Sequence, residues 1–300
     1  MPTWTWGVIA RWVLPWMIAF SVAFAGDRLT DQAWSSYWGS GAIVVSVLWS
    51  FPGIRSWAVA IVAFGGVWVG FNLLRALAAR SDLALVGPFA VGRLDERMLG
   101  GVLTSQRLQE RSIVTAGISP IDIALTLIHL SFFVVPFLIA LLLWIQNSRT
   151  FWRFTVATAI CFAIAVIGLF FLPTAPPWMR DPASVSRIPH RVLVDFGLLR
   201  EGGNGSAYGF EPNALAAFPS VHVAATVLVL LAMWKEAERW RWTRSIRTAS
   251  LLYAVAMSFG VIYLGEHYLL DVWGGWLAAF VGWGIANWIM TDLRQRGWMR

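Results

Sequence analysis

Two short polar segments in an otherwise apolar chain carry the residue types that chemistry needs. Segment 265–271 (GEHYLLD) places His267 four residues before Asp271, and segment 218–222 (FPSVH) holds Ser220 and His222. Residues four apart share one face of a helix, so Asp271 can accept a hydrogen bond from one ring nitrogen of His267. The other ring nitrogen would then be free to act as a nucleophile or base.

Segment 218–222 is typical of a helix start, because proline is favoured in the first helical turn. Such a start directs backbone N–H groups and the positive end of the helix dipole outward, which suits a phosphate. Ser220 adds a hydroxyl contact, and His222 could act as general acid toward a leaving oxygen. Together the two segments predict a phosphoryl-transfer site in which His267 attacks phosphorus and a phosphohistidine forms.

Each segment also has a structural interpretation. His222 alone could cap a helix or lie at a membrane interface, and His267 with Asp271 could be a structural pair or bind a metal. A three-histidine cage is hard to assemble, since His129 lies inside an apolar run and His190 in a loop. The single cysteine excludes an intramolecular disulfide and a cysteine-based metal site. We therefore expect no metal and no cofactor.

The composition is that of a polytopic membrane protein. Hydrophobic residues make up 58% of the 300 and charged residues 13%, whereas soluble domains carry about twice that charge. The 20 tryptophans agree, since tryptophan gathers at membrane interfaces. The net charge of +7 fits basic cytoplasmic loops near anionic lipid, so we expect membrane lipids and no nucleic acid as partners.

Eight apolar runs could cross a bilayer, of which 38–51 is short and interrupted near Pro52. They are 7–25, 38–51, 57–79, 120–146, 152–172, 218–235, 247–264 and 269–290. The first is interpreted as a membrane segment rather than a removed signal peptide. With eight crossings, four basic clusters near residues 55, 149–153, 235–247 and 294–300 share one side with the N-terminus. Because short basic loops face the cytoplasm, both polar segments should lie at the extracytoplasmic face of the cell membrane.

The long connections should help to build that face. Segment 80–119 mixes apolar and charged residues as one or two amphipathic helices at the interface would. Segment 173–217, rich in Pro and Gly, predicts a turn region. Gly265 and the pair Gly274–Gly275 are expected to allow tight turns and close helix packing rather than to bind a ligand.

Segments 218–222 and 265–271 resemble the second and third signature motifs of the type 2 phosphatidic acid phosphatase superfamily. Segment 172–178 (LPTAPPW) resembles the branch of inositol phosphorylceramide synthase and its bacterial relatives. The resemblance covers about 57–290. The apolar runs and basic clusters predict one or two N-terminal extra transmembrane segments in 1–56 and a cytoplasmic tail in 291–300. The resemblance implies an all-α, six-helix membrane domain over 57–290. It also implies His267 as nucleophile, Asp271 as its orienter, His222 as acid/base and Ser220 as a phosphate contact.

One departure concerns positive charge. Hydrolytic members of the superfamily carry a basic first motif and an arginine shortly before the nucleophilic histidine, where this chain has Val261. The inositol-transferring branch shares this lack. A pentacoordinate phosphate still needs a nearby cation. The candidates are Arg75, which is similar to an arginine of bacterial relatives, and Arg180, Arg187 and Arg191 in the 173–217 segment.

The sequence thus predicts a metal-independent enzyme that transfers a phosphoinositol-type head group between lipids, with a lipid phosphate as substrate. Arg75, Arg191, Ser220 and Tyr268 are the expected substrate contacts, although Arg75 could instead extend to the interface and Tyr268 could be an ordinary interface tyrosine. If water rather than an alcohol is the acceptor, the same residues make a lipid phosphate phosphatase. A transporter or membrane scaffold is the non-enzymatic alternative. The sequence indicates no oligomeric state.

Overall fold

The computed structural model describes residues 55–111, 117–198 and 213–296, and the elements in these ranges are helices. A parallel bridge between Thr174 and Ala216 is the β pairing found there. The predicted spans 7–25 and 38–51 lie outside the described residues. The chain forms two compact units that divide after Arg80. Helix α4 (Arg55–Ala78), with Arg75 in its last turn, is the described helix of the first unit.

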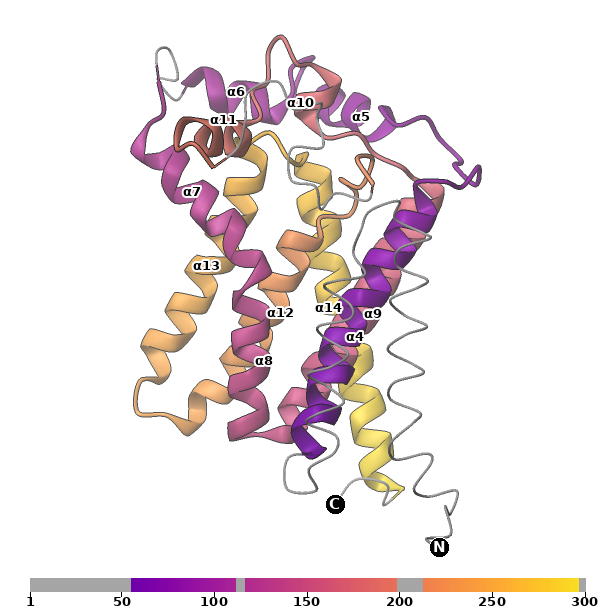
Figure 1. Cartoon of the computed structure of the whole chain (residues 1–300), viewed down its shortest axis with the longest axis vertical. Helices are drawn as coiled ribbons and strands as arrows, with labels where there is room; N and C mark the ends of the chain where they lie inside the picture. Colours follow the sequence, from indigo (N-terminus) through magenta and orange to yellow (C-terminus); the bar gives the residue numbers. More distant parts are fainter. Residues whose placement is uncertain (1–54, 112–116, 199–212, 297–300) are drawn as a thin grey trace, which may run out of the picture. The chain divides into compact units, whose positions relative to one another are not determined.

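The second unit is a bundle of long helices. It contains α7 (Pro120–Leu130), α8 (Val135–Gln146), α9 (Ser148–Phe171), α12 (Val221–Glu236), α13 (Thr243–Tyr263) and α14 (Leu269–Gln295). Helix α12 packs against α9, α13 and α14, while α14 also packs along α9 and α13 along α7 (Figure 1). Helix α12 is thus surrounded by other helices, which explains why most of its side chains are buried.

Helices α4, α9, α13 and α14 are long and apolar enough to cross a membrane. The predicted span 120–146 is not one helix: α7 and α8 meet at a bend of 49° across the short 3₁₀ helix η2 (Ser131–Phe133). Pro136 in the first turn of α8 lacks an N–H and cannot continue the hydrogen bonds of α7, so the helix breaks there. The predicted span 218–235 is α12, whose 16 residues fall just below the usual length of about 17–25.

Large apolar side chains cover the outside of the bundle. Among the exposed ones on α13 and α14 are Leu251, Leu252, Val255, Phe259, Trp273, Leu277, Phe280, Val281, Ile285 and Trp288. So many exposed large apolar side chains on two long helices are typical of a surface that faces lipid rather than water. The chain is therefore an all-α, polytopic membrane protein, as its composition predicts.

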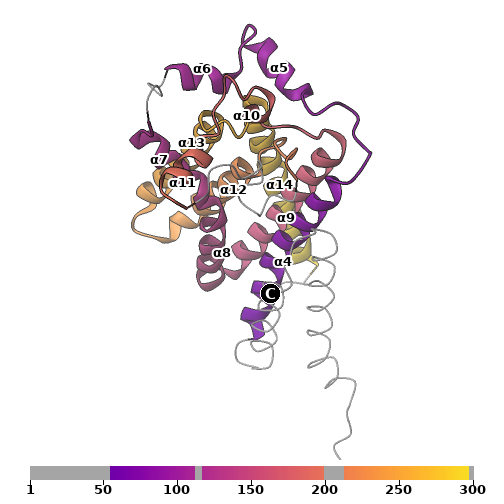
Figure 2. The same ribbon diagram turned by 45° about the horizontal axis from the view of Figure 1, so that its top comes forward.

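Four short helices form a cap at the end of the bundle where α12 and α14 begin (Figure 1). They are α5 (Ala90–Met98), α6 (Thr104–Arg111), α10 (Pro177–Arg180) and α11 (Ile188–Asp195). Figure 2 brings this end forward. Segment 80–119, for which one or two amphipathic helices were predicted, contains α5 and α6. The 173–217 segment holds the helices α10 and α11 where a turn region was predicted. Prolines in the first turns of α10 and α11 explain the difference, since they start a helix as readily as they form a turn.

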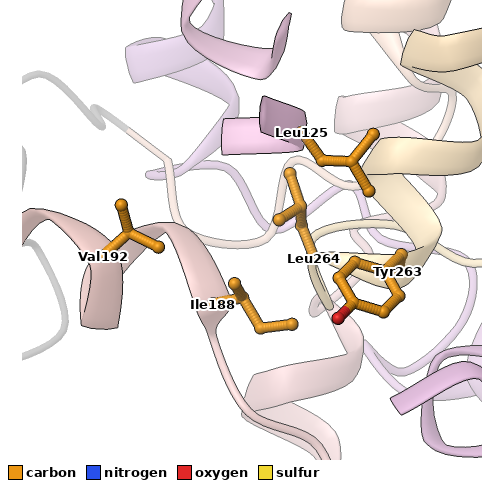
Figure 3. Packing of buried hydrophobic residues seen from close by; sticks show 5 residues of the cluster. All are labelled: Leu125, Ile188, Val192, Tyr263 and Leu264. Carbon is orange, nitrogen blue, oxygen red and sulfur yellow. The ribbon is translucent and has the colours of Figure 1, made fainter. Parts of the chain in front are cut away.

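A buried apolar cluster ties the cap to the bundle. Ile188 and Val192 of α11 pack against Leu125 of α7 and against Tyr263 and Leu264 at the end of α13 (Figure 3). The Tyr263 hydroxyl donates a hydrogen bond of 2.7 Å to Asp122 Oδ1 on α7. The contacts hold the end of α13, and so the start of the 264–268 turn, in a fixed place.

Candidate functional site

The turn between α13 and α14 sets the position of His267. The backbone N–H groups of Glu266 and His267 both donate to the carbonyl of Val261, at 3.1 and 3.0 Å. Gly265 has φ +81°, and a Cβ there would lie 2.7 Å from the carbonyl oxygen of Ser186. Only glycine satisfies both conditions without strain, so the tight-turn role predicted for Gly265 is confirmed.

His267 and Asp271 are in contact, but not along one helix face as the four-residue spacing predicts. Helix α14 begins at Leu269, so His267 precedes the helix and Asp271 lies in its first turn. The Asp271 carboxylate folds back, accepting a hydrogen bond of 2.8 Å from the backbone N–H of Tyr268. The same oxygen, Oδ2, lies 3.3 Å from His267 Nδ1. A carboxylate that caps its own helix thus reaches the preceding histidine.

These neighbours define which nitrogen of His267 carries hydrogen. Nδ1 faces two acceptors, the Ala217 carbonyl oxygen at 2.9 Å and Asp271 Oδ2. Both lack a hydrogen to donate, so Nδ1 must donate. In neutral His267 the lone pair is therefore on Nε2. The Ala217 contact was not predicted, because a backbone carbonyl can belong to any residue and the spacing of side chains does not indicate it.

The 218–222 segment is held directly against the 265–271 segment. Ser220 is the N-cap of α12, and its hydroxyl accepts from the backbone N–H of Val223 at 3.4 Å. Its own N–H donates to the backbone carbonyl of Asp271 at 3.0 Å. A Cβ on Gly275 would lie 2.6 Å from the Ser220 carbonyl oxygen. This closeness confirms the packing role predicted for Gly275.

The result is direct contact between two histidines that are 45 residues apart in the chain. His222 Nδ1 lies 3.2 Å from His267 Nε2. Because Nε2 of neutral His267 is an acceptor, the His222 Nδ1 donates to it. His267 is buried and His222 half-buried. The arrangement could supply a nucleophile, since the Nε2 lone pair of His267 has a fixed direction, and the second imidazole beside it can donate and accept protons.

Sequence reasoning missed a third histidine. The His129 ring on α7 lies 4.4 Å from the His222 ring, centroid to centroid. Its place in an apolar run was used only as an argument against a three-histidine metal site. Placing a polar ring inside a membrane segment costs free energy, so such a residue often has a function. This argument could have identified His129 from the sequence. Within the described ranges, no group of three or more His, Cys, Asp or Glu side chains is arranged to hold a metal ion.

Tyr268, a predicted head-group contact, is fully buried. Its side chain packs with Leu103 and Val185 in the cap, and the hydroxyl has no hydrogen-bond partner among the described residues. Burial, and secondarily the Asp271 carboxylate, raises the pKa of Tyr268, so its hydroxyl stays protonated.

Asp95 of α5 connects the short helices to the start of α14. Its carboxylate accepts a hydrogen bond of 3.0 Å from the backbone N–H of Leu269, the first residue of α14.

Two of the arginines considered as phosphate cations are already paired. Arg180 Nε donates to Glu96 Oε1 at 3.1 Å, and Arg187 Nε donates to Glu266 Oε1 at 2.8 Å. The Arg187 guanidinium also lies 4.5 Å from the centre of the Trp178 ring. Arg191 is exposed on α11, where Nη1 contacts Ser186 Oγ at 3.4 Å. Arg75 belongs to the first unit, and its position relative to the histidines is not described.

A second polar cluster lies at the other end of α12. Glu236 Oε1 accepts from Thr150 Oγ1 at 2.6 Å and from Asn147 Nδ2 at 2.8 Å. Its other oxygen pairs with Arg239 Nε at 3.2 Å. Glu236 is buried, so these partners offset the cost of burying its charge. This cluster fixes α12 against α9 at the end opposite the histidines.

Comparison with known proteins agrees with the geometry. The sequence model of the PAP2 superfamily matches residues 111–285. The chain is 29% identical over 176 residues to the phosphoinositol dihydroceramide synthase of Bacteroides thetaiotaomicron, with 54% of each chain covered. The chain thus spans about half the length of the curated relative it matches. No solved structure gives a significant match.

Proposed function

The chain belongs to the PAP2 superfamily, and on that basis we propose that it is an integral-membrane lipid phosphotransferase that moves a phosphoinositol-type head group through a phosphohistidine. The observation that supports this best is the pair of histidines. His267 Nε2 is directed at His222 Nδ1 at 3.2 Å, while His267 Nδ1 is tied to Asp271 and to the Ala217 carbonyl.

In the first step, His267 Nε2 attacks the phosphorus of a lipid phosphodiester. The bond from phosphorus to the diacylglycerol oxygen breaks, and a nitrogen–phosphorus bond forms. Asp271 stabilises the positive charge that develops on the His267 ring. His222 is protonated when the anionic phosphodiester binds beside it. It gives one ring proton to the departing oxygen, so diacylglycerol leaves as a neutral alcohol.

In the second step, His222 acts in reverse. Its neutral ring accepts the proton of an acceptor alcohol, whose oxygen attacks the phosphorus. The nitrogen–phosphorus bond breaks, the transferred head group is now carried by the acceptor lipid, and both histidines return to their starting forms. No metal ion or cofactor takes part in either step.

The kind of head group is proposed from the relative. That protein's name gives phosphoinositol dihydroceramide as its product. For this chain we therefore take phosphoinositol as the group transferred and dihydroceramide as the lipid that receives it. The missing basic residue six before His267, where this chain has Val261, is a feature that the resemblance assigns to the transferring branch. We therefore take a lipid alcohol, rather than water, as the acceptor.

The remaining contacts extend the sequence predictions. Ser220 and the first N–H groups of α12 would contact phosphate oxygens. Arg191 would supply positive charge from the cap, Arg75 stays a second cation predicted from the sequence, and Tyr268 would support the head group indirectly. We assign 57–290 to the catalytic domain, 1–56 to N-terminal extra membrane segments and 291–300 to a cytoplasmic tail. The site would face the extracytoplasmic side of the cell membrane, since the basic residues described in 149–153, 235–247 and 294–296 lie at the helix ends away from the histidines.

Trapping the intermediate tests this mechanism. The purified chain is incubated with phosphatidylinositol carrying ³²P, without acceptor and with a chelator present, and the protein is tested for acid-labile, alkali-stable label. We expect label on the wild type and none on His267→Ala. His190→Ala is the matched control, since His190 lies in the cap helix α11 and should keep full labelling. Equal label on wild type and His267→Ala would exclude His267 as the nucleophile.

The acceptor is tested separately. Diacylglycerol release from phosphatidylinositol should rise when dihydroceramide is added, with one phosphoinositol dihydroceramide formed for each diacylglycerol. Release of inorganic phosphate from phosphatidic acid at a comparable rate, independent of dihydroceramide, would instead assign the chain to the lipid phosphate phosphatases. Turnover of neither lipid, with an intact fold, would favour a transporter or scaffold.

A further inference from the structure

The break between α7 and α8 brings two aromatic rings against His222. His129 is in the last turn of α7, and its ring lies 4.4 Å from the His222 ring at an interplanar angle of 41°. Phe132, in η2, lies 4.3 Å from the same ring at 49°. Both rings are buried. The side chain of His222 is therefore in contact with flat aromatic surface contributed by the broken helix.

The break itself is held in place from α13. Ser131 Oγ lies 2.8 Å from the Tyr253 hydroxyl and also donates to the carbonyl oxygen of Ile128. These bonds fix the turn that carries His129 and Phe132. The turn that carries the two rings is thus anchored to α13.

A fixed surface of this kind matters for a side chain in the first turn of a helix. The His222 ring can rotate about two bonds, and several staggered orientations are open to a half-buried side chain. Only some of these direct Nδ1 at His267 Nε2. Aromatic pairs prefer tilted and offset arrangements such as those seen here, so contact with His129 and Phe132 favours a subset of orientations.

We propose that His129 is a positioning residue for His222, whose ring it stacks against so that the His222 ring edge faces His267. In this role His129 acts through the His222 ring, which it contacts. The inference rests on the proposed function, because it assumes that His222 is the proton donor and acceptor of the reaction.

Three variants of His129 and its neighbourhood separate stacking from general packing. His129→Ala should lower kcat for phosphoinositol transfer from phosphatidylinositol to dihydroceramide by about tenfold, with KM within twofold. His129→Phe keeps a flat ring and should recover most of the activity. Phe133→Ala is the matched control, since this exposed ring on the same turn lies 6.5 Å from His222 and should change kcat little.

Combining His129→Ala with His222→Ala distinguishes a positioning role from a structural one, because the transfer rates of the double and single variants are compared. If His129 acts through His222, the double variant His129→Ala/His222→Ala should be no slower than His222→Ala alone. A further tenfold loss in the double variant, or failure of His129→Phe to recover activity, would overturn the proposal. If His222→Ala alone leaves transfer unchanged, the proposed function fails instead, so the two failures are distinguishable.

The leaving group gives an independent check. A p-nitrophenyl phosphodiester releases an anion that needs little protonation, so labelling of His267 by this probe should not depend on the acid. His129→Ala should then label at the wild-type rate with the p-nitrophenyl probe while remaining slow with phosphatidylinositol. Equal losses with both substrates would show that His129 supports the fold or the nucleophile rather than His222.

Discussion

His222 Nδ1 and His267 Nε2 lie 3.2 Å apart, which is hydrogen-bonding distance and too close to admit a phosphorus atom between them. A nucleophile approaches phosphorus from about 3–3.5 Å, and the acid must lie within about 2.6–3.2 Å of the leaving oxygen on the far side. The proposed mechanism therefore requires the two rings to separate when a phosphoester binds. The closed contact keeps the lone pair of His267 hydrogen-bonded until a substrate displaces it.

The first prediction concerns Asp271, whose carboxylate is fully buried beside His267 Nδ1. Asp271→Asn keeps an oxygen for the Tyr268 N–H but removes the charge that stabilises the His267 ring during attack. We expect kcat to fall by about 10³ to 10⁴, as it does when a buried orienting aspartate is neutralised. Steady-state transfer assays measure this. Asp292→Asn, on the same helix in an exposed ion pair with Arg296, should behave as wild type.

The second prediction concerns the contact between α14 and the start of α12. Gly275→Ala places a methyl group 2.6 Å from the Ser220 carbonyl oxygen and 3.1 Å from Val223 Cβ, so α12 must shift. Displacing His222 by about 1 Å should reduce transfer by about 100-fold. The matched control is Gly284→Ala, where a Cβ on the same helix meets no atom within 4 Å. Full activity of Gly275→Ala would mean that the placement of α12 is not critical.

Some of the site residues could be predicted from the sequence and others could not. The partners His267, Asp271, Ser220 and His222 were found because their types and order along the chain were informative. The contact of the Asp271 carboxylate with the backbone N–H of Tyr268 was not predicted, since the sequence does not fix where α14 begins relative to His267. The contacts made by His129 and the Ala217 carbonyl could not be predicted either, because they depend on the bend at residues 131–134 and on backbone atoms.

The third prediction concerns the ion pair next to the nucleophile. Arg187 and Glu266 are both about nine-tenths buried, so removing one partner leaves an uncompensated charge, which costs about 3–5 kcal/mol. Arg187→Ala should lower the thermal midpoint in detergent by several degrees and also reduce activity, because Glu266 adjoins His267. The double variant Arg187→Met/Glu266→Met should recover much of the stability. A midpoint equal to that of wild type in Arg187→Ala would contradict the importance of this pair.

The fourth prediction separates the two cations proposed to contact phosphate. Arg191→Ala should raise KM for phosphatidylinositol by about tenfold if one charge-assisted hydrogen bond is lost. Arg75→Met should lower kcat more than it raises KM if that charge acts on the transition state. Arg296→Ala, remote from the cap in the last turn of the bundle, serves as the charge control. Unchanged kinetics in Arg191→Ala and Arg75→Met would leave the phosphate charge to His222 and the α12 N-terminus alone.

The length of α12 has a consequence for how the enzyme meets its substrate. Its 16 residues extend only about 24 Å, whereas the hydrocarbon layer of a bilayer is about 30 Å thick. Both ends of this helix are polar, one at Ser220 and His222 and the other at Glu236. Because longer helices enclose α12, at least one of these polar ends lies below the level of the lipid phosphates. A donor lipid would then reach the histidines by sinking slightly or tilting while its tails stay dissolved in the membrane, and a water-soluble head group without tails would have no such route.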